Sequence, residues 1–128
     1  ITESKNLSNT DNLFPLTIFN VSFDDQVFDK FETFGPLLGV NYYSNEKKLM
    51  NKIASSNYSL VCYIYTKNKK FIDFSKNLKF GSIGINTTKI QSPGSPTGGN
   101  DLSGIGREGG IWGFEEFLST VNYVKDKI

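Results

Sequence analysis

The sequence contains no histidine and a single cysteine, Cys62, among its 128 residues. Disulfides need two cysteines, while zinc sites and many general-base pairs depend on histidine or on several cysteines. The composition therefore argues against a disulfide framework, a zinc site and any histidine-based catalytic pair, and we predict no metal site. Cys62 lies within the apolar run LVCYIY. Burial there would raise the pKa of the thiol, so we expect an inert cysteine and not a nucleophile.

Long apolar runs and an excess of charge of one sign are also lacking. The longest apolar stretch has about six residues, far short of the roughly 20 that span a bilayer. The 14 basic and 13 acidic residues interleave along the chain, which disfavours a surface for nucleic acid or for anionic lipid. No charged and then apolar leader opens the chain. We expect a cytoplasmic protein with no nucleic-acid partner and no membrane partner.

What the sequence does contain is an alternation of strand and helix patterns. PLLGVNYY (36–43), LVCYIY (60–65) and GSIGIN (81–86) have strand character, and the unbroken middle run is typical of a strand buried on both faces. Apolar residues at helical spacing follow Ser44, a candidate cap, and recur from Phe71 to Leu78. This order predicts an α/β fold with a βαβαβ parallel sheet core and helices on its faces.

The two ends of the chain have weaker patterns. Residues 1–12 are polar and aperiodic, and we interpret them as a flexible lead-in. FPLTIFNVS (14–22) predicts a short strand or an extended arm. Toward the other end, residues 112–118 predict a short amphipathic helix and VNYV (121–124) predicts a closing strand.

A long glycine-rich loop is predicted over residues 87–109, too long to be a simple connector. Gly104, Gly106 and Gly109 have the spacing Gly-x-Gly-x-x-Gly of a dinucleotide-binding turn, but that turn must follow a strand, and a loop precedes it here. We interpret these glycines as positions that let the loop fold tightly. For Arg107, the only arginine, we favour a clamp on loop carbonyls or a carboxylate over an anion-binding role.

Three segments together resemble the aldehyde dehydrogenase family. FETFGP (31–36) is similar to its Glu-x-Phe-Gly-Pro motif, and NYSLVCYIYT (57–66) is similar to its Tyr-Gly-Leu segment at the start of a strand. GINTTKIQSPGSPTGGNDLSGIGREGG (84–110) is similar to its Gly-x-x-Asn, Pro-Phe-Gly-Gly and Ser-Gly-x-Gly-Arg-Glu stretch. YIYT, GINT and SGIGREGG lean toward the succinate-semialdehyde dehydrogenase branch. The resemblance implies that residues 13–118 are the carboxy-terminal part of the catalytic domain and residues 119–128 a C-terminal oligomerisation strand.

The resemblance also implies a cofactor contact at Glu32 and Phe34. The Glu32 carboxylate would accept hydrogen bonds from the nicotinamide ribose, Phe34 would pack beside it, and the Gly35-Pro36 turn would fix their aim. The cofactor would be NAD or NADP, bound by the full-length enzyme and not by this chain alone. The alternatives are a solvated surface acid for Glu32 and a core aromatic for Phe34.

Residues 87–97 are similar to the wall of the family's aldehyde pocket. In the semialdehyde branch a serine there holds the distal carboxylate of the substrate, and alignment places Gln91 at that position, with Ser92 next to it. Gln91, Ser92 and Ser95 are therefore candidate substrate-binding residues for a small-molecule aldehyde. The alternative is that these polar loop residues are simply solvated.

The sequence also departs from the family pattern. The cysteine nucleophile, the glutamate base and the Rossmann domain are missing from this segment, so we expect no catalysis from the chain alone. The function expected is that of a carboxy-terminal segment of an NAD(P)-dependent aldehyde or semialdehyde dehydrogenase, partnered by the remainder of the enzyme or another subunit in a homo-oligomer. The alternatives are a non-catalytic module that caps a full-length dehydrogenase through its C-terminal strand, and a free-standing nucleotide binder. Single-residue departures are Ser59 for Gly, Thr97 for Phe, Asp101 for Lys and Val121 for Lys.

Overall fold

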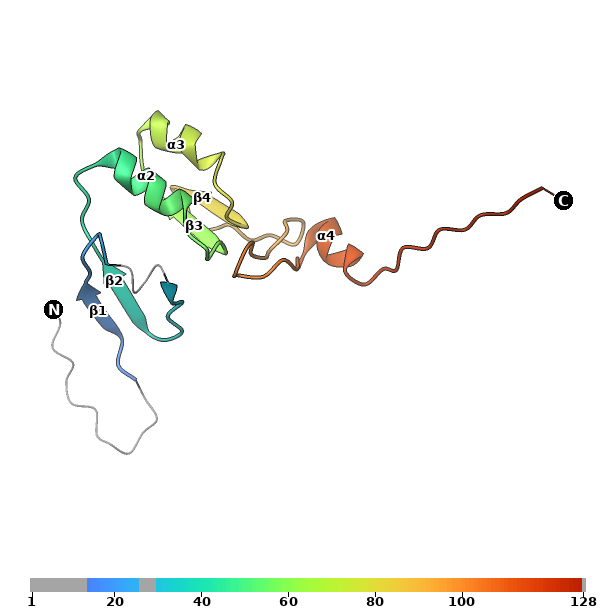
Figure 1. Cartoon of the computed structure of the whole chain (residues 1–128), viewed down its shortest axis with the longest axis horizontal. Coiled ribbons are helices and arrows are strands. Elements are labelled where there is room, and N and C mark those ends of the chain that lie inside the picture. The colour runs from blue at the N-terminus through green and yellow to red at the C-terminus, as the bar shows by residue number, and fades with distance from the viewer. Residues whose placement is uncertain (1–13, 26–29, 128) are drawn as a thin grey trace. The chain divides into compact units, whose positions relative to one another are not determined.

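The chain divides into two units, residues Ile1–Asn57 and Tyr58–Ile128. The structure, a computed structural model, describes residues 14–25 and 30–127 (Figure 1). The predicted lead-in over residues 1–12 lies outside the described residues. Within the described part, each unit contains one two-stranded parallel sheet.

The sheet of the first unit pairs β1 (Thr17–Asn20) with β2 (Leu37–Val40). The register runs from Thr17 opposite Leu37 to Asn20 opposite Val40. The β-branched and aromatic residues of TIFN favour an extended backbone, as the sequence predicts. The Thr17 N–H donates to the Pro36 carbonyl at 2.8 Å, so the chain entering β2 is tied to the start of β1.

Helix α2 (Glu46–Ala54) follows β2 in the chain. Its N-cap is Asn45, whose side-chain oxygen accepts from the Lys48 N–H at 3.0 Å. The prediction of Ser44 as the cap was wrong by one residue, because the capping side chain must directly precede the first helical residue to reach that N–H. Met50 is buried on the apolar face of α2, with Leu49 and Ile53 half-buried beside it.

Helix α2 is fastened to the segment that follows β1. Lys48 forms an ion pair with Asp24 at 2.9 Å. The ammonium group of Lys52 donates to the Phe23 carbonyl at 2.7 Å. Both ammonium groups also lie over the Phe23 ring, 5.7 Å from its centroid for Lys48 and 5.1 Å for Lys52. These contacts fix Phe23 against α2 within the first unit.

The second unit is built on a β–α–β unit. β3 (Val61–Ile64) and β4 (Ser82–Ile85) are parallel, with Val61 opposite Ser82, and α3 (Lys69–Ser75) joins them. The side chain of Asn68 caps α3 by accepting from the Lys70 N–H at 3.0 Å. Phe71 on α3 is buried. The predicted α/β class, with parallel strands and helices between them, is confirmed.

The strand pairing differs from the predicted single βαβαβ sheet. β2 bonds to β1 and β3 bonds to β4, so the described strands form two separate pairs. The prediction that LVCYIY is buried on both faces was also wrong for this chain, because Tyr63 is 46% and Tyr65 64% exposed. An unbroken apolar run favours burial, but the described residues do not supply a layer that covers these two rings.

The C-terminal part contains the predicted loop and one helix. Residues 87–109 are irregular apart from isolated bridges, and α4 (Gly110–Glu115) follows, two residues earlier than predicted. Residues 119–127 form neither helix nor strand, so the predicted closing strand is not formed within the chain. A strand needs a partner for its backbone groups, and Val121, Tyr123 and Val124 remain about 80% exposed.

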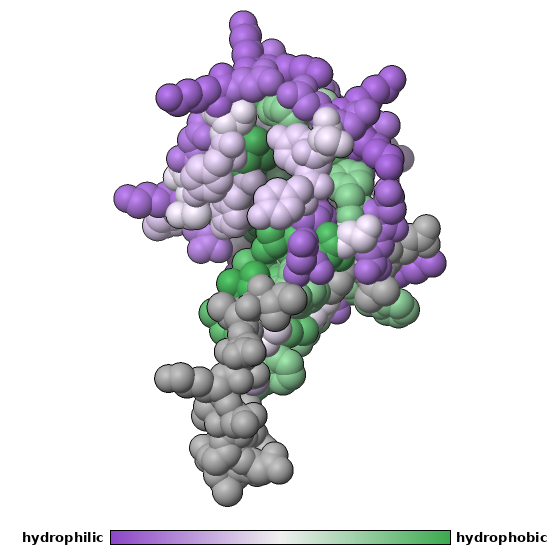
Figure 2. Space-filling model, turned by 90° about the vertical axis from the view of Figure 1, so that its left-hand side faces the viewer, coloured by the Kyte–Doolittle hydropathy of each residue, from purple (hydrophilic) through white to green (hydrophobic). Residues whose placement is uncertain are grey.

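Apolar side chains reach the surface in the first unit as well. Leu16, Ile18 and Leu38, in and beside β1 and β2, are 43 to 74% exposed. Figure 2 shows apolar side chains gathered on the face turned to the viewer. No helix in the described ranges is long and apolar enough to cross a membrane.

Candidate functional site

The predicted cofactor residues, Glu32 and Phe34, lie in the segment just before β2. Both side chains are exposed, and Phe34 is 90% exposed, so it is not a core aromatic of this chain. Among the described residues the Glu32 carboxylate has no hydrogen bond and no ion pair. The Gly35-Pro36 turn behind them is held by the bond from the Thr17 N–H to the Pro36 carbonyl.

The predicted substrate residues lie in the second unit, where Ser92 and Ser95 form a tight turn. The Ser95 Oγ accepts from the Ser92 N–H at 2.8 Å and donates to the Ser92 carbonyl at 2.9 Å. The Ser92 Oγ donates to the Ser95 Oγ at 3.2 Å. The neighbouring Gln91 is exposed, and its side chain has no hydrogen bond among the described residues. The turn therefore uses both serine hydroxyl protons and leaves the Gln91 amide available.

Asn86 fixes the point at which this loop leaves β4. Its side chain accepts from the Thr66 N–H and donates to the Thr66 carbonyl, both at 2.8 Å. Asn86 adopts a left-handed conformation with φ 54°, which asparagine tolerates better than most residues. The carboxyl ends of β3 and β4 are thereby joined through one side chain. Sequence reasoning used Asn86 only as part of a motif and did not predict this contact.

Arg107 is the clamp of the glycine-rich loop, as predicted. Its guanidinium donates to the Gly99 carbonyl, to the Gly106 carbonyl at 2.9 Å and to the Asn100 side-chain oxygen at 2.6 Å. The acceptors are carbonyls and an amide, not the carboxylates that the sequence also offered. Thr97 and Glu108 exchange two backbone hydrogen bonds of 2.7 Å, which close the base of the loop.

The structural setting of the Gly-x-Gly-x-x-Gly spacing is the one expected for a loop. A turn over residues 101–103 precedes it, and the following α4 has only six residues with no side-chain cap. Gly104 and Gly109 have φ angles of 91° and 74°, which favour glycine. A carbon at the Cβ position of Gly109 would lie 2.6 Å from the Ser95 carbonyl oxygen. Gly109 therefore permits a close backbone approach, and Gly104 permits a left-handed turn.

Ser59 is marked by the sequence only as a departure from the family pattern, with no predicted role. It is 2% exposed, and its N–H donates to the Ser103 Oγ at 3.0 Å. Its own hydroxyl donates to the Asp101 carboxylate at 3.3 Å. Ser59 and Asp101 are both departures from the family pattern, and the coincidence of two polar departures is the signal that would have found the pair.

Cys62 lies on β3, half-buried, and burial raises the pKa of its thiol above the ordinary value. The direction agrees with the prediction of an unreactive cysteine. Among the described residues no group of three or more Cys, Asp or Glu side chains is placed to hold a metal ion.

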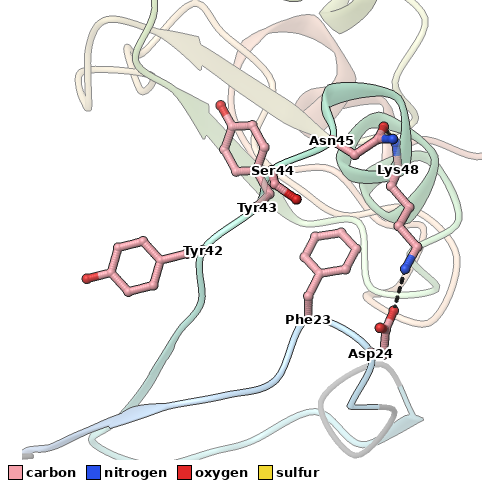
Figure 3. A pocket seen from close by; sticks show the side chains of 7 residues that line it. All are labelled: Phe23, Asp24, Tyr42, Tyr43, Ser44, Asn45 and Lys48. Carbon is pink, nitrogen blue, oxygen red and sulfur yellow. Dashed lines mark hydrogen bonds and ion pairs between the residues drawn. The ribbon is translucent and has the colours of Figure 1, made fainter.

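A separate hollow in the first unit is shown in Figure 3. The two charges on its wall, Lys48 and Asp24, neutralise each other, and Tyr42 points away from the Phe23 ring. The contacts at its wall are those that fasten α2 to the segment after β1. We interpret this hollow as a packing feature and not as a ligand site. Its lining residues are Phe23, Asp24, Tyr42, Tyr43, Ser44, Asn45 and Lys48.

Comparison with known proteins decides the family. The family model described as "Aldehyde dehydrogenase family" matches residues 2–123. The chain belongs to the aldehyde dehydrogenase family. The resemblance seen in the sequence motifs is thereby confirmed.

Individual members of the aldehyde dehydrogenase family show the same relationship. The chain is 31% identical to an aspartate-semialdehyde dehydrogenase (non-phosphorylating) of Halomonas elongata, over 85% of this chain and 22% of that protein. It is 32% identical to a succinate-semialdehyde dehydrogenase of Paenarthrobacter nicotinovorans, over 70% of this chain and 20% of that protein. The crystal structure of the Mycobacterium tuberculosis aldehyde dehydrogenase complexed with NAD+ matches with a TM-score of 0.66 and 35% identity, over 78% of this chain and 21% of that one. The chain thus spans about one fifth of the length of the curated relatives it matches.

Proposed function

We propose that this chain is the carboxy-terminal segment of the catalytic domain of an NAD(P)-dependent aldehyde dehydrogenase. The complete enzyme oxidises an aldehyde, a semialdehyde in the branch that the motifs favour, to a carboxylic acid. In that reaction aldehyde, water and NAD(P)+ yield the acid, NAD(P)H and a proton. The family membership and the semialdehyde dehydrogenases among the similar proteins support this proposal. The nucleophile and the general base belong to parts of the enzyme outside this segment.

The observation that carries the cofactor role is the free carboxylate of Glu32. A carboxylate is a pure acceptor that can take two hydroxyl donors, and neither carboxylate oxygen of Glu32 accepts a hydrogen bond from a described residue. The exposed ring of Phe34 offers a flat apolar surface in the same short segment. These residues fit a ribose, with Glu32 holding its hydroxyls and Phe34 packing beside it. When bound, NAD(P) supplies the hydride acceptor of the reaction.

Residues 87–97 form the proposed substrate wall, and its candidate ligand contacts are Gln91, Ser92 and Ser95. Because the hydroxyl protons of Ser92 and Ser95 are donated within the turn, the Gln91 amide is the group with free N–H donors. We assign Gln91 the contact to a polar or carboxylate end of the aldehyde. Ser92 and Ser95 hold the shape of the wall, and their hydroxyl oxygens accept from a substrate group that carries an O–H or N–H donor.

The test of the cofactor role is Glu32→Gln in the complete enzyme that carries this segment. Losing one charged acceptor is expected to raise KM for NAD(P) about tenfold and to leave KM for the aldehyde nearly unchanged. Glu115→Gln, at an exposed carboxylate on α4, is the matched control and should change neither constant. An unchanged KM for NAD(P) in Glu32→Gln would remove Glu32 from the site. The 128-residue chain alone is expected to produce no NAD(P)H.

The alternative, a non-catalytic module that associates with a full-length dehydrogenase, has one observation in its favour. Val121, Tyr123 and Val124 are exposed in a segment with no regular structure of its own, and such residues favour pairing with another sheet edge. The same feature supports a homo-oligomeric enzyme. Tyr123→Pro with Val124→Lys should abolish co-elution with a full-length dehydrogenase if the module hypothesis holds, because proline has no backbone N–H to bond a sheet edge. Co-elution that survives both substitutions would contradict it.

A further inference from the structure

Ser59 uses all of its polar groups within the second unit. Its carbonyl accepts from the Gly81 N–H at 2.9 Å and from the Asn100 N–H at 3.2 Å. Its N–H donates to the Ser103 Oγ and its hydroxyl to the Asp101 carboxylate. Three of these four bonds reach residues 100–103, more than 40 positions along the chain. Ser59 therefore joins the start of β3 to one turn of the glycine-rich loop.

Asp101 presents its carboxylate from a strained position. Its φ of 52° is in the left-handed region, which aspartate tolerates better than most residues. The turn around it is closed by the bond from the Gly104 N–H to the Asp101 carbonyl at 3.1 Å. Asp101 also forms an isolated antiparallel bridge with Tyr58. The backbone therefore holds the carboxylate at the Ser59 hydroxyl.

Asn100 connects the same turn to the rest of the loop by a hydrogen bond. The side-chain oxygen of Asn100 accepts from Arg107, whose guanidinium also binds the Gly99 and Gly106 carbonyls. Arg107 directly precedes Glu108, the backbone partner of Thr97. Thr97 ends the segment assigned to the substrate wall. A displacement of residues 100–103 would therefore be transmitted to that wall.

We propose that Ser59 and Asp101 form a latch that positions the loop Thr97–Glu108. The two residues replace the glycine and the lysine expected from the family pattern, and both changes are needed for the bond. Glycine has no hydroxyl donor and lysine has no acceptor, so with either of these residues in place the bond could not form. Ser59 and Asp101 are positioning residues, and their effect on aldehyde binding rests on the proposed function, whereas the latch itself does not.

Backbone hydrogen exchange on the full chain tests the latch. Ser59→Ala and Asp101→Gly each remove one partner, and glycine keeps the left-handed backbone available. Each is expected to speed exchange in residues 97–108 about fivefold, and the double variant should be no faster than the faster single one. Asp101→Asn keeps an acceptor oxygen and should restore slow exchange. Unchanged exchange in both single variants, or effects that multiply in the double variant, would overturn the proposal.

A second buried serine supplies the control. Ser75 is 5% exposed and its hydroxyl donates to the Ile72 carbonyl at 2.7 Å within α3. Ser75→Ala should leave exchange in residues 97–108 unchanged, both alone and when it is combined with Asp101→Gly. If Ser59→Ala fails to fold, Asp101→Gly at its exposed site gives the same loop readout.

The complete enzyme separates the latch from the proposed function. Asp101→Gly should raise KM for the aldehyde while Asp101→Asn should not. Faster loop exchange in Asp101→Gly with an unchanged KM would uphold the latch and contradict the assignment of residues 87–97 to the substrate wall.

Discussion

The two segments proposed to contact ligands are held in different ways. In the segment 31–36 the side chains of Glu32 and Phe34 are exposed, and the described contact that anchors it is the bond between Pro36 and Thr17. The glycine-rich loop, residues 87–109, is held by its own hydrogen bonds, from the serine turn through the Thr97–Glu108 pair to Arg107. An irregular segment can thus be held by its own hydrogen bonds or by the ligand that it binds. The packing of the loop can be tested in this chain alone, whereas the role of Glu32 can be tested only with a ligand present.

Among the substitutions that test how the glycine-rich loop is held, Gly81→Ala should have the largest effect on stability. A Cβ at Gly81 would overlap the carbonyl group of Gly98, which is backbone and cannot move aside cheaply. We expect the free energy of unfolding to fall by about 3 kcal/mol in urea denaturation. Gly94→Ala is the matched control, because nothing lies within 4 Å of its added carbon. Equal stabilities for the two variants would show that the loop is not packed as described.

Arg107→Ala should cause the second-largest loss of stability. It removes hydrogen bonds from a charged donor to three carbonyls and to the Asn100 side-chain oxygen, and we expect the free energy of unfolding to fall by about 2 kcal/mol. Arg107→Lys should recover only part of this, since an ammonium cannot span the same acceptors. Lys76→Ala, which breaks an exposed ion pair with Asp73, is the control and should cost less than about 0.5 kcal/mol. A loss in Arg107→Ala no larger than in this control would contradict the clamp.

Ser95→Ala tests the hydrogen bonds of the serine turn within the loop. Its hydroxyl both accepts from and donates to Ser92, and we expect its removal to cost about 1 kcal/mol. Gln91→Ala, at a side chain with no described partner, should leave the thermal midpoint unchanged. A larger loss from Gln91→Ala than from Ser95→Ala would reverse the roles assigned to them.

The smallest effect is expected at Cys62 on β3. Burial raises the pKa of its thiol, so the folded chain holds the proton more tightly than the unfolded chain does. This contribution to stability is complete below the ordinary thiol pKa of about 8.5 and is lost as the pH rises through it toward the raised value. Iodoacetamide should accordingly react more slowly with the folded chain than with the chain in urea at pH 8. Equal alkylation rates would contradict the burial of Cys62.

Much of the fold could be predicted because its signals are local. The apolar spacing in α2 and α3 and the glycine-rich loop depend on neighbours in sequence, and Arg107 had no competing arginine. The strand pairing could not be predicted in the same way, because β1 and β2 meet through residues 20 positions apart. The role of Ser59 could not be predicted for the same reason, since it depends on hydrogen bonds to residues 100–103.

Amide hydrogen exchange of the unmodified chain, resolved by residue, tests the central claim most directly. The account predicts that the N–H groups of Thr97, Ser103 and Glu108, all bonded within the loop, exchange at least about tenfold more slowly than those of Glu32 and Phe34. Equal exchange in the two segments would mean that the loop is not fixed by its own hydrogen bonds, and the distinction drawn between them would fail.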